Sequence, residues 1–370
     1  MTGFKARYSY LQEQFSDPTL ILAELAKLVH SGDFTLGKPV AEFERRFSEL
    51  IGVRHAIGVG SGTDALKLPL KALGISHGDE VITAANTFIA TAGAIAETGA
   101  APRFVDCNDT FCLDAGQIEA AITPKTKAIM PVHLTGEPAD MDAIMQIAKK
   151  HSLVVVEDAC QAILAEFNGR RAGTYGIAAG YSLHPLKNLN VWGDGGIVVT
   201  NDDALAERVR LIRNHGLKNR DEVAILGCNS RLDSAQAVVG NWLIGSTGEI
   251  TAKRIDNAAY YDAAFRKIAG VRLPPRRKNV RCVYHLYMVF AEQRDALYRY
   301  CLDHGVEAKV HYPIPLYQQE AFRSFGYQRG QFPVSDRHAR EVISFPVDQH
   351  ITRAQQDIVI ETVKAFYGSR

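Results

Sequence analysis

Long apolar stretches are missing from this sequence of 370 residues. No run approaches the roughly 20 apolar residues that a membrane-spanning helix needs, so we expect no membrane-embedded segment. The opening stretch, MTGFKARYSYLQEQFSD, is polar and aromatic and contains no apolar core followed by a small-residue cleavage site. It therefore does not look like a secretory signal, and we expect a cytoplasmic protein.

Paired cysteine motifs and an excess of either charge are also absent. The six cysteines are scattered without a C-x-x-C pair, which predicts reduced thiols and no metal site. The net charge of +1 gives no reason to expect a nucleic acid or a membrane surface as a partner. Composition therefore leaves an ordinary globular enzyme as the class to test.

Short apolar runs alternate with helical patterns along most of the chain. This alternation predicts an α/β fold with a mostly parallel central sheet and flanking helices. The length favours two domains, a large one over residues 1–247 with a helical segment at its N-terminus, and a smaller α/β domain over residues 248–370. The expected strands are residues 55–60, 80–83, 103–106, 126–132, 153–156, 177–183, 197–199, 284–290, 306–311 and 343–346, and the expected helices are residues 16–31, 39–51, 64–73, 114–122, 141–151, 203–215, 248–268, 294–304 and 354–367.

The stretch from Val154 to Thr200 carries the main chemical signal. A short β-branched run leads into Asp158, as in a buried parallel strand, and the C-terminal ends of such strands are where open α/β sheets bind ligands. Lys187 follows 29 residues later (187 − 158 = 29), between a second apolar run and a Gly-rich turn. An acid and an amine at neighbouring strand ends suit pyridoxal phosphate, because the lysine can form a Schiff base while the carboxylate keeps the pyridine nitrogen protonated. For each residue considered alone there is an alternative without a cofactor: Asp158 caps a helix, and Lys187 is a solvated loop lysine.

A second ligand-binding signal lies near the start of the expected sheet. Residues 55–60 predict a strand that runs into Ser61-Gly62-Thr63 and then into a helix. Backbone N–H groups at such a helix N-terminus bind phosphate. The glycines do not form the G-x-G-x-x-G fingerprint, so a nicotinamide-dependent oxidoreductase remains a rival without its motif.

The motifs EDACQA, YSLHPLKNL and GDGGIVVT together resemble the DegT/DnrJ/StrS family of sugar aminotransferases, from about Phe34 to the C-terminus. The resemblance implies a fold-type-I aminotransferase with pyridoxal phosphate. It also implies amino transfer from an amino acid, expected to be glutamate, to a nucleotide-linked or phosphorylated keto sugar. The expected assembly is a homodimer with shared active sites.

The resemblance also implies roles for individual residues. Lys187 and Asp158 are the expected catalytic pair, with Phe88 stacked on the pyridine face and Gln161 at the phenolic oxygen of the cofactor. The residues expected to hold the phosphate are Gly62, Thr63, Ser182 and, from the partner subunit, Asn229. Weaker substrate candidates are His184, Arg231 and Tyr312.

Several of these interpretations stay open at the level of sequence. Asn229 can equally be a turn residue and Arg231 a structural one. His184 contacts phosphate or substrate, or only shapes the turn with Pro185. The basic run Arg276-Arg277-Lys278 is either an exposed loop or a contact for an anionic acceptor. Family members that dehydrate sugars place histidine at the reactive lysine, so Lys187 favours amination over dehydration; a cofactor-binding regulator without turnover is a third possibility.

Overall fold

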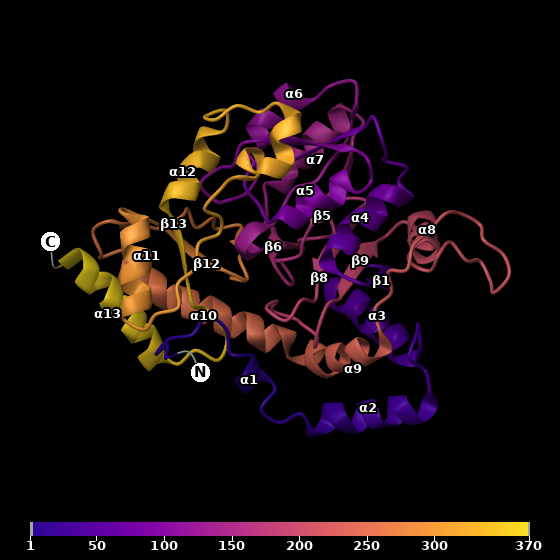
Figure 1. Cartoon of the computed structure of the whole chain (residues 1–370), viewed down its shortest axis with the longest axis horizontal. Coiled ribbons are helices and arrows are strands. Elements are labelled where there is room, and N and C mark those ends of the chain that lie inside the picture. Colours follow the sequence, from indigo (N-terminus) through magenta and orange to yellow (C-terminus); the bar gives the residue numbers. More distant parts are fainter. Residues whose placement is uncertain (1–2, 369–370) are drawn as a thin grey trace.

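The computed structural model describes residues 3–368 and contains a central seven-stranded sheet between helices (Figure 1). The strand order is β1-β9-β8-β5-β4-β2-β3. The strands span His55–Val59 (β1), Glu80–Ala84 (β2), Ala101–Val105 (β3), Thr126–Ile129 (β4), Val154–Asp158 (β5), Ala178–Ser182 (β8) and Gly196–Thr200 (β9). Each of them lies within two or three residues of an expected strand, and the α/β fold is confirmed.

The sheet is parallel except for one strand. The pairs β2–β3, β2–β4, β4–β5 and β5–β8 are parallel, whereas β9 is antiparallel to both of its neighbours, β1 and β8. The Gly-rich turn at residues 193–196 reverses the chain into β9. Because β1, β2, β5 and β8 run in the same direction, their carboxyl ends meet at one edge of the sheet, which is the edge expected to bind ligands.

Helices cover the two faces of this sheet with different sets of apolar residues. On one face, Ile197 and Val199 of β9 pack with helices α3 (Lys38–Ile51) and α9 (Ser234–Leu243). On the other face, Val198 packs with α4 (Gly62–Ala72) and α8 (Asp203–Arg213). Side chains along a strand point to alternate faces, so an unbroken apolar run is what a strand buried on both sides requires. Helix α7 (Met141–Lys150) packs on the half of the sheet that contains β4 and β5.

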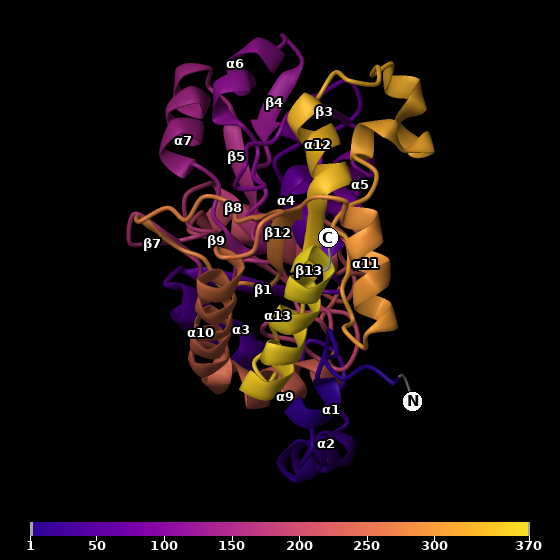
Figure 2. The same ribbon diagram turned by 90° about the vertical axis from the view of Figure 1, so that its left-hand side faces the viewer.

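The C-terminal third forms a second, smaller sheet with its own helices. Strands β10 (Val271–Arg272), β12 (Tyr287–Ala291) and β13 (Val342–Phe345) make a three-stranded sheet. Helices α10 (Thr247–Phe265) and α13 (Arg353–Gly368) lie side by side against it, and α11 (Arg294–Asp303) also packs there (Figure 2). The largest side chains of this core are Tyr261, Phe265, Tyr287 and Phe345, all fully buried.

Some local expectations were wrong. Residues 306–311 form no strand and make only isolated bridges: Val306 pairs with Ala6 of the N-terminal segment, and Lys309 pairs with Ser344 of β13 through bonds of 2.9 and 3.0 Å. The helix expected at residues 114–122 is a 3-10 turn, Ala115–Gln117, followed by the short α6, Ile118–Ala121. The other helices and strands not expected are α1 (Leu11–Gln14), α5 (Ile89–Ala96), α12 (Pro333–Glu341), the edge strand β10, and a small sheet of β6 (Glu166–Phe167), β7 (Arg170–Arg171) and β11 (Val280–Arg281).

The N-terminal helix α2 (Thr19–Ser31) lies at the outer edge of the molecule, next to α9 (Figure 1). Across residues 3–368, none of the helices combines the length and the apolar character needed to cross a lipid bilayer.

Candidate active site

A pocket of about 410 Å³ opens at the carboxyl ends of the parallel strands. The pocket is lined by segments that follow β1, β2, β5 and β8 and by residues of the C-terminal third. It is lined by most of the site residues expected from the sequence: Gly62, Thr63, Phe88, Asp158, Gln161, Ser182, His184, Lys187 and Tyr312. A larger groove of about 960 Å³ beside β10 and α11 contains none of them.

Asp158 is the last residue of β5 and is only 5% exposed. Its Oδ2 accepts a 2.7 Å hydrogen bond from Thr91 Oγ1, and its Oδ1 accepts one of 3.1 Å from the Cys160 N–H. Each carboxylate oxygen can accept more than one hydrogen bond. The acid is therefore held in place and can still accept a hydrogen bond from a ligand in the pocket.

Lys187 lies in the turn after β8, and its backbone is fixed on both sides. Its N–H bonds to His184 O at 2.8 Å, and its carbonyl accepts a 2.8 Å bond from Asn190 Nδ2. Burial lowers the pKa of the Lys187 amine, while Cys160 and Asp158 act in the opposite direction. A lowered pKa increases the fraction of neutral amine, which is the nucleophilic form.

The N-terminus of α4 forms the opposite end of the pocket. Ser61 caps the helix by accepting a 3.1 Å bond from Asp64 N–H, which leaves the earlier N–H groups of the first turn available to an anion. A methyl group on Gly62 would lie 2.6 Å from Ser182 Cβ. Only glycine therefore allows the first turn of the helix to approach Ser182 at the end of β8.

Aromatic and amide side chains border the middle of the pocket. Phe88 is 51% exposed, an unusual state for an apolar ring at the start of a helix, and its ring centre lies 6.1 Å from that of Tyr312. Gln161 is fixed because its Oε1 accepts a 2.7 Å bond from Thr135 N–H. Burial raises the pKa of the Tyr312 hydroxyl, so it is a neutral hydrogen-bonding group.

His184 lines the pocket and also shapes the turn. Its Nδ1 accepts a 3.3 Å bond from Leu186 N–H. Burial, followed by the Lys187 charge, lowers the pKa of its imidazole. This hydrogen bond supports the predicted role of His184 in shaping the turn. Because His184 also lines the pocket, a contact with substrate stays a prediction.

Two of the expected site residues lie outside this pocket. Asn229 is exposed, and its backbone pairs with that of Asn214 in an isolated antiparallel β-bridge. Arg231 Nη1 donates a 3.0 Å hydrogen bond to Asn214 Oδ1. Arg231 therefore holds the local loop together within this chain.

The basic run at residues 276–278 is not a free anion contact. Arg276 makes two 2.8 Å bonds to Asp262, and Arg277 Nε bonds to Glu137 Oε1 at 2.9 Å. Lys278 is exposed, and the pairing of the two arginines gives no support to a contact between this run and a substrate phosphate. Their acidic partners lie 14 and 140 residues away in sequence, so spacing could not reveal them.

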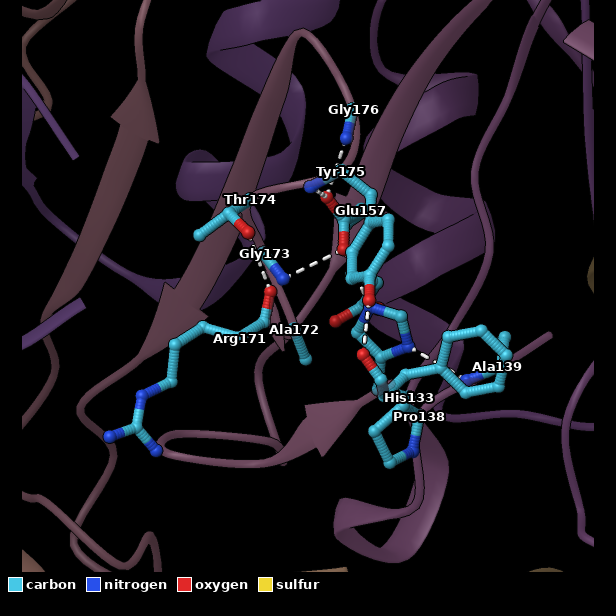
Figure 3. A network of polar contacts seen from close by, with 12 residues as sticks. His133, Pro138, Ala139, Glu157, Arg171, Ala172, Gly173, Thr174, Tyr175 and Gly176 are labelled. Atoms are coloured by element: carbon cyan, nitrogen blue, oxygen red, sulfur yellow. Dashed lines mark hydrogen bonds and ion pairs between the residues drawn. The ribbon is translucent and has the colours of Figure 1, made fainter. Parts of the chain in front are cut away.

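A buried polar network adjoins Asp158, and sequence reasoning missed it (Figure 3). The Glu157 carboxylate is fully buried and accepts 2.7 Å bonds from the N–H groups of Gly173, Tyr175 and Gly176. His133 Nε2 bonds to it at 3.0 Å, and Ala139 N–H bonds to His133 Nδ1 at 3.0 Å, so the hydrogen of this imidazole is on Nε2. The network ties two loops to the strand end that carries Asp158.

Two further histidines, His285 and His311, line the pocket without having been expected there. Burial lowers the pKa of His311 to about 4 and that of His285 well below its ordinary value. His311 Nδ1 bonds to Ser344 Oγ at 2.8 Å. Both side chains come from the C-terminal third, and no local motif signals their approach to Lys187.

Comparisons with known proteins agree with this geometry. The structure of "S. venezuelae DesV in complex with ketimine intermediate" is 38% identical and matches with a TM-score of 0.95 over 98% of each chain. A "Pleiotropic regulatory protein" of Geobacillus stearothermophilus is 44% identical over 94% of each chain. The "dTDP-3-amino-3,4,6-trideoxy-alpha-D-glucose transaminase" of Streptomyces venezuelae is 40% identical over 92% of this chain and 90% of its own. Other relatives are named for UDP-linked sugars.

Fold and pocket together define a transaminase that depends on pyridoxal phosphate, and related structures hold this cofactor or its amino form. The model of the DegT/DnrJ/EryC1/StrS aminotransferase family matches residues 17–364, and the chain belongs to that family.

The residues of the pocket fit the cofactor. A helix N-terminus closed against Ser182 by Gly62 suits a phosphate, and the exposed Phe88 offers a flat apolar face. The buried Asp158 and Lys187 line the same cavity. Asp158 suits the pyridine nitrogen of the cofactor, and the Lys187 amine suits its aldehyde.

Proposed function

We propose that this transaminase moves an amino group from glutamate to a nucleotide-linked keto sugar in amino-sugar biosynthesis. The observation that carries the proposal is the meeting of Lys187, Asp158 and the α4 N-terminus in one pocket. The nucleotide is supported by relatives named for dTDP-linked and UDP-linked sugars. The paired state of Arg276 and Arg277 gives no support to the alternative of a sugar phosphate bound by those residues.

Lys187 has two tasks in this proposal. Its neutral amine would hold the cofactor through the aldehyde carbon, with water as the leaving group, and the freed amine would carry a proton between the α-carbon of the donor and the cofactor carbon. When bound, pyridoxal phosphate supplies an electron sink for the negative charge left on that carbon. The lowered pKa of Lys187 favours the neutral form that accepts the proton.

The other pocket residues position and protect the reacting groups. Asp158 would accept a hydrogen bond from the protonated pyridine nitrogen and so keep the ring cationic. Phe88 would cover one face of the ring, Gln161 would contact its phenolic oxygen, and Ser182 with Gly62 and Thr63 would bind the phosphate. Tyr312 and His184 face the substrate side of the pocket.

We also propose a homodimer in which Asn229 completes the partner's phosphate site. The loop after α8 projects from the molecule (Figure 1), and it carries Val223 at 61% and Leu226 at 97% exposure. A partner subunit packed on this loop would bury both side chains, which supports the proposal. The separate apolar core of the C-terminal third supports a domain boundary near residue 247, and six free cysteines support a cytoplasmic location.

Two half-reactions test the proposed function. Glutamate added to the cofactor-loaded protein is expected to bleach the visible absorption of the lysine-bound cofactor, and a dTDP- or UDP-linked keto sugar is expected to restore it. The same restoration is then measured with three other acceptors: the corresponding sugar phosphate, the free keto sugar and a cyclitol ketone.

The panel separates the alternatives. If no amino acid bleaches the absorption, the protein binds the cofactor without turnover, as a regulator would. If the sugar phosphate restores the absorption as well as the nucleotide sugar does, the nucleotide is not part of the specificity. If glutamate bleaches it and a dehydrated sugar is released without amination, the protein is a dehydratase.

A further inference from the structure

The amide of Gln161 is fixed in one orientation at the wall of the cofactor pocket. Gln161 lines the pocket and is 9% exposed. Its Oε1 accepts the 2.7 Å hydrogen bond from Thr135 N–H. A backbone N–H can only donate, so the atom that meets it must be the amide oxygen. The NH2 group of Gln161 is therefore at the other end of the amide.

The NH2 group is also the end that faces the pocket. Thr135 is buried and lines a separate cavity, so its hydrogen bond directs the amide oxygen away from the cofactor pocket. Tyr312 does line the cofactor pocket, and its hydroxyl interacts with the Gln161 side chain. Burial raises the pKa of this hydroxyl, and the interaction with Gln161 acts to lower it, as a donor does and an acceptor does not. The amide group beside Tyr312 is therefore NH2.

The turn that presents the Thr135 N–H is held from two sides. Its backbone at Thr135 has a φ of 65°, a left-handed conformation that is costly for a β-branched residue and persists only where the surroundings hold it. On one side, His133 N–H bonds to Asp158 O at 3.0 Å, at the end of β5. On the other side, Val283 N–H bonds to Gly136 O at 3.1 Å. The strand end that carries Asp158 therefore also sets the position of the Thr135 N–H.

The buried network of Figure 3 adds a side-chain anchor to this turn. His133 stands at its start, with Nε2 bonded to the Glu157 carboxylate at 3.0 Å and Nδ1 accepting from Ala139 N–H at 3.0 Å. Both nitrogens of the imidazole are thus engaged, and the start of the turn is tied to β5 by backbone and side chain.

We propose that Thr135 is a positioning residue of the cofactor site: its N–H holds the amide of Gln161 so that NH2, and not the oxygen, meets the phenolic oxygen of pyridoxal phosphate. The inference rests on the contact between Gln161 and that oxygen in the proposed function. A donor favours the anionic form of the phenolic oxygen, whereas an amide oxygen in its place would disfavour it. The orientation set by Thr135 therefore makes the lysine-bound cofactor release its proton at a lower pH.

A pH titration of the visible absorption of the cofactor-loaded protein tests this orientation. Gln161→Met removes the amide but keeps the length of the side chain. It is expected to raise the midpoint by about 1 to 2 pH units, because the phenolic oxygen loses a donor and the proton is held more tightly. Thr135→Gly keeps the N–H and suits a positive φ, so it is expected to keep the wild-type midpoint. The other titratable side chains of the pocket are the same in every variant: Asp158, Cys160, His184, Asp194, His285 and His311.

Gly136→Ala tests the turn itself. Gly136 has a φ of 92°, and an added Cβ would lie 2.7 Å from Val283 Cγ2 and 3.1 Å from Gln161 O. The variant is expected to raise the midpoint less than Gln161→Met does, because the turn shifts and weakens the hold on the amide. The double variant is expected to match Gln161→Met alone, since the turn acts through Gln161. Gly248→Ala is the matched control, because an added Cβ on this exposed part of α10 meets nothing, and it is expected to keep the wild-type midpoint.

Amide hydrogen exchange in the cofactor-free protein measures the hydrogen bond without turnover. The Thr135 N–H is expected to exchange about 3- to 10-fold faster in Gln161→Met than in the wild-type protein, because its acceptor is gone. The amides of α13 are expected to keep their wild-type exchange rates. NMR spectra of the two proteins give both sets of rates.

The proposal is overturned if Gln161→Met lowers the midpoint, or leaves either the midpoint or the exchange of Thr135 unchanged. It is also overturned if the shifts of Gly136→Ala and Gln161→Met add; should Gly136→Ala not fold, the titration and the exchange of Gln161→Met still decide. Failure of the wild-type protein to react with any amino acid would instead contradict the proposed function, and neither of these two measurements depends on that reaction.

Discussion

Replacing Lys187 with alanine is expected to abolish transamination and to remove the visible absorption of the bound cofactor. No other lysine lines the pocket in the described part of the chain, so the variant has neither an amine for the aldehyde carbon nor a group to carry the proton. Loss of the proton carrier alone is worth up to about 10⁴-fold in rate. The measurements are the absorption spectrum after incubation with pyridoxal phosphate and the rate of the glutamate half-reaction.

Two further variants make this prediction specific. Lys187→Arg keeps the charge but is expected to be inactive as well, because a guanidinium does not become a neutral nucleophile near neutral pH. Lys71→Ala, at the exposed end of α4, is expected to match the wild-type protein in absorption and rate. A coloured and active Lys187→Ala variant would show that the cofactor is attached elsewhere.

Replacing Glu157 with glutamine is expected to destabilise the fold by about 1–3 kcal/mol, although the two side chains have nearly the same shape. The buried carboxylate accepts from three backbone N–H groups and from His133 Nε2 (Figure 3). The amide of glutamine would turn an N–H group toward at least one of these donors and leave it without a partner. The free energy of unfolding can be measured from denaturant titrations of the two proteins at equal concentration.

The matched control for this variant is Glu119→Gln. Glu119 is partly exposed and pairs with Lys150 and His151 at 2.8 Å, so its loss is expected to leave the unfolding midpoint essentially unchanged. An unchanged midpoint in Glu157→Gln would mean that the network in Figure 3 does not hold its two loops to β5.

The sequence allowed the sheet, and the meeting of Asp158 and Lys187 at neighbouring strand ends, to be predicted because both depend on local patterns. Apolar runs buried on both faces located the strands, and the 29 residues between Asp158 and Lys187 matched one crossover between neighbouring strands. The structure places these two strands, β5 and β8, side by side in the sheet. The turn around Gly62 was predictable for the same reason, since strand, small residues and helix follow one another in the chain.

Residues whose partners lie far away in sequence could not be predicted. Thr91 reaches Asp158 across 67 positions, and His133 reaches Glu157 across 24. The charges of Arg276 and Arg277 looked available because their acidic partners come from other elements. The strand expected at residues 306–311 is reduced to isolated bridges with Ala6 and Ser344, which also lie far away in sequence.

The most direct test is to locate the bond between protein and cofactor. The cofactor-loaded protein is reduced with borohydride, digested and mapped by mass spectrometry. The expected result is a single pyridoxyl-phosphate modification on Lys187, and its loss when glutamate is added before the reduction. A modification on another lysine, or none at all, would contradict the assignment on which the active site rests.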